Sequence, residues 1–103
     1  MGTEAEKIVV SVEARFKKQV STFLEKRRRD VSEIAGGIGK GDYDSIKMLG
    51  AGLKKMSEGF GMDALSQLGQ ALETAGALKD SGRIKTVVKE LTDYLDRLSV
   101  EFV

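Results

Sequence analysis

The side chains best placed to bind a partner surround Ala51. Lys47 and Lys55 stand four residues to either side of it, and Lys54 stands three residues after it. Residues three or four positions apart lie on the same side of a helix, so these three ammonium groups would surround one patch. The spacing therefore predicts a positively charged surface around a small, unreactive side chain.

Gly50 and Gly52 bracket Ala51 in the same stretch. Glycine inside a helix costs about 1 kcal/mol relative to alanine, and it leaves a flat surface that another backbone can approach closely. This pattern indicates a face that a second protein could contact. An alanine among lysines is also ordinary solvent-facing helix surface, and the residues alone leave both interpretations open.

The sequence lacks the groups that most enzymes use for nucleophilic and acid–base chemistry. Its 103 residues include no histidine and no cysteine, which excludes phosphohistidine, thiolate nucleophiles and disulfides. The carboxylates of Glu58 and Asp63 are close in sequence, but a glycine turn lies between them. No acidic cluster within one loop suggests a magnesium or calcium site. We therefore expect no enzyme activity, no cofactor and no bound metal ion.

The composition is typical of one small helical domain. Seventeen basic and sixteen acidic residues give a net charge of +1, which argues against nucleic-acid binding. No apolar run is long enough to span a membrane, and no secretory signal is present. Together with the absence of cysteine, these features predict a cytoplasmic protein with no membrane partner.

The apolar spacing predicts an all-α fold, an up-and-down antiparallel four-helix bundle with a possible short extra N-terminal helix. Residues 1–11 are expected to form a flexible or extended lead-in, and residues 12–103 the bundle. Helices are expected over residues 13–38, from the N-cap Asp42 to the glycines at 59 and 61, over residues 62–78, and from Ile84 to near Phe102. The connections are short, which forces neighbouring helices to run antiparallel.

The second of these helices has an apolar seam whose members follow one another at alternating spacings of three and four. They are Ile46, Leu49, Leu53, Met56 and Phe60. At about 100° per residue, Ala51 lies about 180° from the centre of this seam. The side chain of Ala51 is therefore expected to point straight into solvent.

Several segments resemble a histidine phosphotransfer (Hpt) domain. Residues 41–43, Ile46 and residues 49–54 are similar to the core of that family, which reads G-D, an apolar seam and then A/G-H-x-L/M-K-G. Further segments are similar to the downstream pattern G-x-x-x-L…L…LE and to the first and last long helices. They are residues 59–61, Leu65, Leu68, residues 72–73, Ala75, residues 23–28 and residues 91–95. The resemblance extends over about residues 12–100.

The resemblance places Ala51 where an Hpt domain has its phosphate-accepting histidine. That histidine receives a phosphoryl group from the aspartate of a receiver domain and passes it on, which alanine cannot do. Lys54 matches the lysine of the motif. Lys55 replaces a glycine, and Met56 replaces a small residue. Three neighbouring departures favour natural loss of phosphotransfer over a single engineered change.

The resemblance implies a signalling module of a two-component or phosphorelay system that docks a receiver domain of a response regulator or a histidine kinase. The expected contact residues are Lys47, Met48, Ala51, Gly52, Lys54, Lys55 and Glu58. Lysines would complement the acidic active site of a receiver. Two alternatives stay open. One is a structural bundle that forms a homo-oligomer through exposed Met48, Met62 or Phe102, and the other is an active Hpt domain whose histidine has been mutated.

Overall fold

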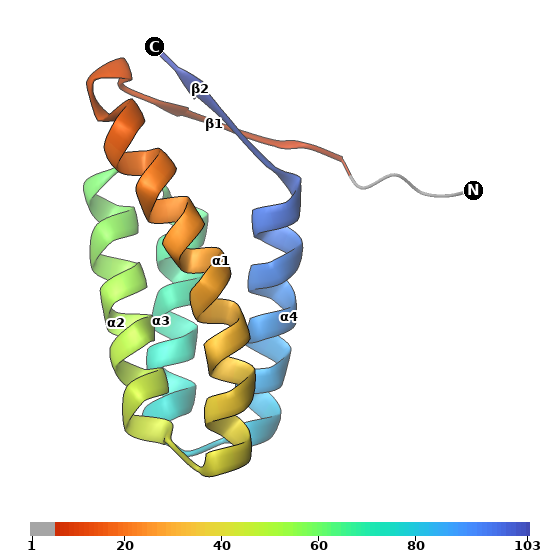
Figure 1. Ribbon diagram of the computed structural model, residues 1–103. Coiled ribbons are helices and arrows are strands. Elements are labelled where there is room, and N and C mark those ends of the chain that lie inside the picture. The colour runs from red at the N-terminus through yellow and green to blue at the C-terminus, as the bar shows by residue number, and fades with distance from the viewer. Residues whose placement is uncertain (1–5) are drawn as a thin grey trace.

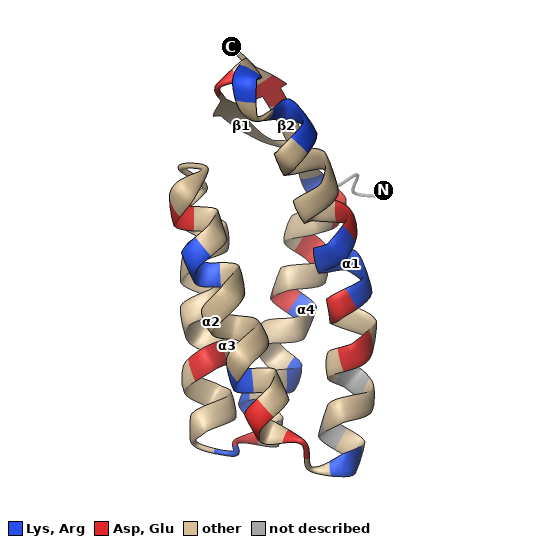
Figure 2. Cartoon of the chain, turned by 60° about the vertical axis from the view of Figure 1, so that its left-hand side comes forward, with Lys and Arg blue, Asp and Glu red and all other residues tan. Residues whose placement is uncertain are grey.

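The computed structural model describes residues 6–103, apart from the side chains of Ala35 and Ile38. The chain is mostly helical, as predicted for an all-α bundle, and its described part contains four helices lying side by side (Figures 1 and 2). In chain order the elements are β1 (Ile8–Val12), a 3₁₀ turn (Ala14–Phe16), α1 (Lys17–Lys40), α2 (Tyr43–Gly59), α3 (Asp63–Ala77), α4 (Ser81–Arg97) and β2 (Leu98–Phe102).

Aspartate side chains cap the starts of α2 and α4, and the sequence predicts the cap of α2 at Asp42. Asp42 Oδ1 accepts a hydrogen bond from the backbone N–H of Ser45 at 3.3 Å, and Asp80 Oδ1 accepts one from that of Arg83 at 3.0 Å. Each cap satisfies an N–H group that has no partner within its helix. α2 therefore begins where its sequence predicts, whereas α4 begins at Ser81 and not at the predicted Ile84.

The first helix is predicted to end near residue 38, within the glycine-rich segment 36–41, and α1 ends in this segment, at Lys40. Only Gly41 leaves the helical conformation, with a φ of +72°. The backbone N–H of Asp42 then bonds the carbonyl of Gly37 at 2.9 Å and closes the helix end. The side chain of Ile46 lies 3.5 Å from the position of a Cβ on Gly37. This packing against α2 favours the helical state despite the low helix propensity of glycine.

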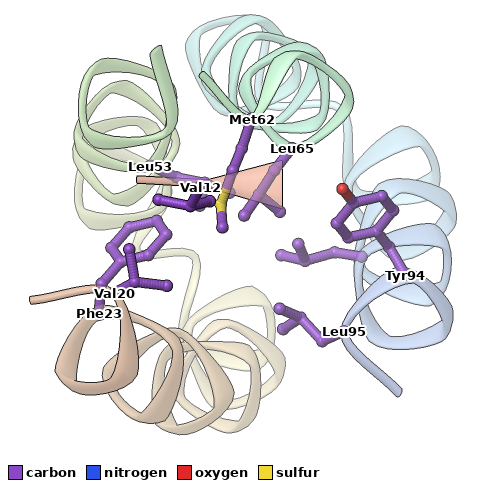
Figure 3. Close-up of a cluster of buried hydrophobic side chains, with 9 residues drawn as sticks. Val12, Val20, Phe23, Leu53, Met62, Leu65, Tyr94 and Leu95 are labelled. Atoms are coloured by element: carbon purple, nitrogen blue, oxygen red, sulfur yellow. The ribbon is translucent and has the colours of Figure 1, made fainter. Parts of the chain in front are cut away.

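The core consists of two clusters of buried apolar side chains at different levels of the bundle. The first contains Val12, Val20, Phe23, Leu53, Met62, Leu65, Leu91, Tyr94 and Leu95 (Figure 3). The second contains Ile34, Ile46, Leu72, Ala75, Ile84 and Val87. Burying one side chain of this kind contributes about 1.5–3 kcal/mol. Met62 is 1% exposed, so it cannot provide the exposed contact considered for self-association.

The two ends of the described chain pair in a parallel two-stranded sheet across one end of the bundle (Figure 1). The register joins Ile8 to Leu98 and Val12 to Phe102. The sequence predicts a last helix reaching Phe102, which is wrong, because α4 ends at Arg97. The strands lie about ninety residues apart, so no local pattern reveals that they pair. Of the predicted lead-in, residues 8–12 form β1, and residues 1–5 lie outside the described residues.

No helix in the described part of the chain is both long enough and apolar enough to cross a membrane.

Tyr94 is the aromatic residue of the first cluster that carries a titratable group. Burial raises the pKa of its phenol above the ordinary value, since desolvation disfavours the charged form. The phenol is therefore neutral at physiological pH and packs as part of the core.

Arg28 joins α1 to the end of α4. Its Nη2 donates a hydrogen bond to the backbone carbonyl of Leu95 at 2.9 Å, and its Nη1 lies 3.4 Å from Asp96 Oδ1. The Leu95 carbonyl belongs to the last turn of α4, where carbonyls have no partner within the helix.

We expect Arg28→Ala to lower the free energy of unfolding by about 1 kcal/mol. The exposed neighbour Arg29 provides the control, since Arg29→Ala should change it by less than about 0.5 kcal/mol. Urea denaturation of both variants measures the difference, and equal effects would contradict this role.

Candidate docking face on α2

The backbones of α2 and α3 are in direct contact. A Cβ atom added at Gly50 would lie 2.8 Å from the carbonyl oxygen of Gly69, and one added at Gly69 would lie 2.5 Å from the amide nitrogen of Lys54. A Cβ at Gly76 would lie 2.8 Å from the amide nitrogen of Lys47. Residue numbers therefore rise along α2 as they fall along α3. Only residues without a side chain permit helices to approach this closely.

This contact turns α2 about its own axis relative to the predicted orientation. The buried residues of α2 are Ile46, Gly50, Leu53 and Ser57. At about 100° per residue, the centre of this set lies about 50° from the centre of the predicted seam. Met56, which the seam placed in the core, is 45% exposed. The small residues of α2 face α3 because they permit backbone contact, which a hydrophobicity pattern does not reveal.

Ala51 is half-buried, so the prediction that it points straight into solvent is wrong. Its chain neighbours Lys47, Gly50 and Lys54 meet the backbone of α3. The two glycines that bracket it also differ in their surroundings. Gly50 is buried against α3, whereas a Cβ at Gly52 would have nothing within 4 Å. The pair does not form the flat open surface that the sequence indicated, and only Gly52 leaves the helix accessible.

The seven predicted contact residues lie along α2, and we call the surface that they form the ridge of α2. Lys47, Lys55 and Glu58 are exposed, and Met48 is 73% exposed. Gly52 and Lys54 are half-buried, like Ala51. Glu58 is tied to α3, because its Oε1 accepts a hydrogen bond from Ser66 Oγ at 3.4 Å. Lys47, Lys54 and Glu58 thus lie toward α3. Lys55 lies on the outer side, and Met48 and Gly52 border a hollow toward α1.

Charge on this ridge is accessible to a partner. In the part of the chain that the structure describes, the ion pairs within 4 Å involve none of Lys47, Lys54 and Lys55. Three ammonium groups on two turns of helix give a local positive potential, although the whole chain is nearly neutral. The ridge can attract an anionic surface, and it contains no group that could act as a nucleophile.

The sequence-based prediction missed the side of α2 that faces α1. There, Met48 and Gly52 line a hollow of about 500 Å³ together with Met56 from α2 and Lys26 and Arg27 from α1. A signal for Arg27 was present in the sequence. Arg27 follows the core residues Val20 and Phe23 of α1 at spacings of three and four. A charged residue therefore occupies a position of the helix that faces the core.

Within the described residues, no three or more acidic, histidine or cysteine side chains come together in a way that could hold a metal ion. Comparisons of the chain with family models, curated proteins and solved structures gave no match. The arguments for function therefore rest on the residues and geometry described above.

The environments of Gly50 and Gly52 predict opposite effects for the same substitution. Gly50→Ala would force the backbones of α2 and α3 apart, and we expect a loss of at least about 3 kcal/mol of stability, typical of severe overpacking. Gly52→Ala adds a methyl group in open space and should stabilise the protein by up to about 1 kcal/mol, through helix propensity. Thermal and urea unfolding of the two variants test this. Similar stabilities would show that α2 and α3 are not in backbone contact.

Proposed function

We propose that this chain is an Hpt-like signalling module of a two-component or phosphorelay system that cannot carry phosphohistidine. In this proposal it docks a receiver domain of a response regulator, or a histidine kinase, through the ridge of α2. The observation that carries the proposal is the cluster of lysines around Ala51, at the position where the resemblance expects the histidine; Lys47 and Lys55 are exposed and Lys54 is half-buried.

The arrangement of the helices supports this proposal. An Hpt domain would have an up-and-down antiparallel topology. The opposite residue order of α2 and α3 along their contact is in agreement with it, as are the short connections at residues 41–42 and 60–62. Such a bundle presents the middle of its second helix away from the chain ends, where a partner domain can reach it.

The chemistry of the ridge suits a partner with an acidic pocket. Lys55 lies on its outer side, Met48 is exposed toward α1, and Gly52 beside them adds no side chain that would hinder approach. Ammonium groups at the edge of an interface accelerate encounter with an anionic surface, and a flexible methionine adapts to its shape. The half-buried Ala51 leaves the centre of the ridge without a reactive group, so binding would occur without phosphoryl transfer.

The lysines provide the main test. We expect substitution of Lys47, Lys54 and Lys55 by alanine to weaken binding to a receiver domain roughly tenfold, since each rim charge contributes up to about 1 kcal/mol at low salt. The matched control replaces the exposed Lys40, Lys85 and Lys89, which changes the net charge equally. Calorimetric titration against a panel of receiver domains measures both. The proposal fails if no receiver binds, or if the two triple variants bind equally well.

A second test separates this proposal from an active domain with a mutated histidine. We expect Ala51→His to remain unphosphorylated when mixed with a phosphorylated receiver that binds the chain, because Lys55 and Met56 replace small residues beside that position. Transfer of radiolabelled phosphate is the measurement, with a known active Hpt domain as the positive control. Efficient labelling of the variant would favour the mutated active domain.

Self-association is the third candidate function, and it depends on the exposed Met48. Of the apolar residues considered for it, Met62 is buried and Phe102 is half-buried, whereas Met48 is 73% exposed. A homo-oligomer built through Met48 would cover the ridge. Sedimentation of the wild type and of Met48→Glu distinguishes a monomer, as expected for the docking module, from such an oligomer.

A further inference from the structure

The inward face of α1 contains a buried ion pair at its centre. The residues of this face follow at spacings of three and four, and they are Val20, Phe23, Arg27, Asp30 and Ile34, each at most 7% exposed. Val20 and Phe23 belong to the first apolar cluster and Ile34 to the second. The charged pair therefore interrupts the core between the two clusters, where apolar side chains would be expected to join them.

The buried Nε of Arg27 has no hydrogen-bond partner. Its Nε lies 3.0 Å from Asp30 Oδ2, as an ion pair, but without the geometry of a hydrogen bond. Its Cζ lies 5.1 Å from the centre of the Phe23 ring. A guanidinium has five N–H groups, and a buried donor without a partner costs free energy. In the described part of the chain, the Nε of Arg27 is such a donor, and its polar neighbour is the carboxylate of Asp30.

Arg27 lines two adjoining hollows whose other lining residues belong to α1 and α2. Figure 2 shows α2 on its left-hand side and α1 on its right-hand side. Their volumes are about 430 and 500 Å³, and they share Lys26, Arg27 and Met56. We call the two hollows together the α1–α2 groove. From Lys18 to Glu33 it follows α1 for about 20 Å at 1.5 Å per residue. This length matches about four turns of a second helix.

The lining of the α1–α2 groove combines apolar and basic groups. Phe23 and the exposed Met48 and Met56 provide apolar surface. Lys18, Lys26 and Arg27 are basic, and Glu33 is the one acidic residue that lines either hollow. An amphipathic helix can place its apolar side in such a groove, and carboxylates on that helix would complement the lysines.

We propose that the α1–α2 groove binds an acidic amphipathic helix of a partner protein. A carboxylate of that helix accepts hydrogen bonds from Arg27, and its apolar residues pack between Phe23 and Met56. Arginine and carboxylate can form two parallel hydrogen bonds, and the fold leaves the Nε donor of Arg27 without one. This inference goes beyond the proposed function, because the site lies on the α1 side of α2 and its test needs no receiver domain.

The probe is a capped 14-residue helical peptide with leucine at alternating spacings of three and four and glutamate flanking the leucines. Its control has glutamine at every glutamate position. Titration of the labelled full chain, followed by heteronuclear NMR, should show amide shifts along α1 and α2. The glutamate peptide should bind at least tenfold more tightly than the glutamine peptide. Equal affinities, no binding, or shifts confined to α3 and α4 would overturn the proposal.

Two variants connect binding to the named residues. Lys18→Glu with Lys26→Glu should lower affinity for the glutamate peptide at least tenfold, and Lys85→Glu with Lys89→Glu on α4 should not. Arg27→Met with Asp30→Leu replaces the ion pair by apolar residues, which commonly preserves or raises stability. This double variant should fold and show a smaller preference for glutamate over glutamine, because Lys18 and Lys26 remain. A folded double variant that keeps the full preference would contradict a role for Arg27.

A second copy of this chain is the other occupant that the measurement can reveal. If the amides of the groove shift with protein concentration in the absence of peptide, the groove is an interface between copies, and the proposal is wrong. Failure of receiver binding leaves these results unaffected, so the two proposals fail separately.

Discussion

The contact between the backbones of α2 and α3 determines how the rest of the bundle is arranged. It depends on Gly50, Gly69 and Gly76, each of which occupies a position where a Cβ would collide with the opposite helix. Because the small side of α2 is used for this contact, its larger side chains point elsewhere. Leu53 enters the core, while Met48 and Met56 lie toward α1 and line the α1–α2 groove. One close approach thus fixes both the packing and the accessible surface of α2.

The same constraint separates the surface of α2 into two functional candidates. Toward α3 and outward, Lys47, Lys54 and Lys55 form a charged ridge around Ala51. Toward α1, the methionines adjoin the buried Arg27, whose charge interrupts the core between two apolar clusters. A buried ion pair contributes little to stability compared with apolar residues of similar size. Its place beside an open groove is therefore better explained by binding than by folding.

Local sequence predicted the parts of the fold that depend on neighbouring residues. The predicted cap at Asp42 begins α2 because its side chain satisfies the amide three residues away. Prediction failed where distant segments decide the outcome. Residues 98–102 form a strand because β1 is available to pair with them. For the candidate site, the sequence identified the lysines but not the orientation of Ala51.

The sequence by itself determined which chemistry is absent and that the chain is mostly helical. Without histidine or cysteine this chain cannot carry phosphohistidine or use a thiolate, whatever its fold, and its apolar spacing specifies helices. Only the tertiary structure decided that Ala51 is half-buried, that Met56 is accessible and that Arg27 lines a groove. The physical reason is that helical periodicity records hydrophobic burial, whereas the rotation of α2 follows from backbone contact between glycines, which contributes no hydrophobic side chain to the pattern.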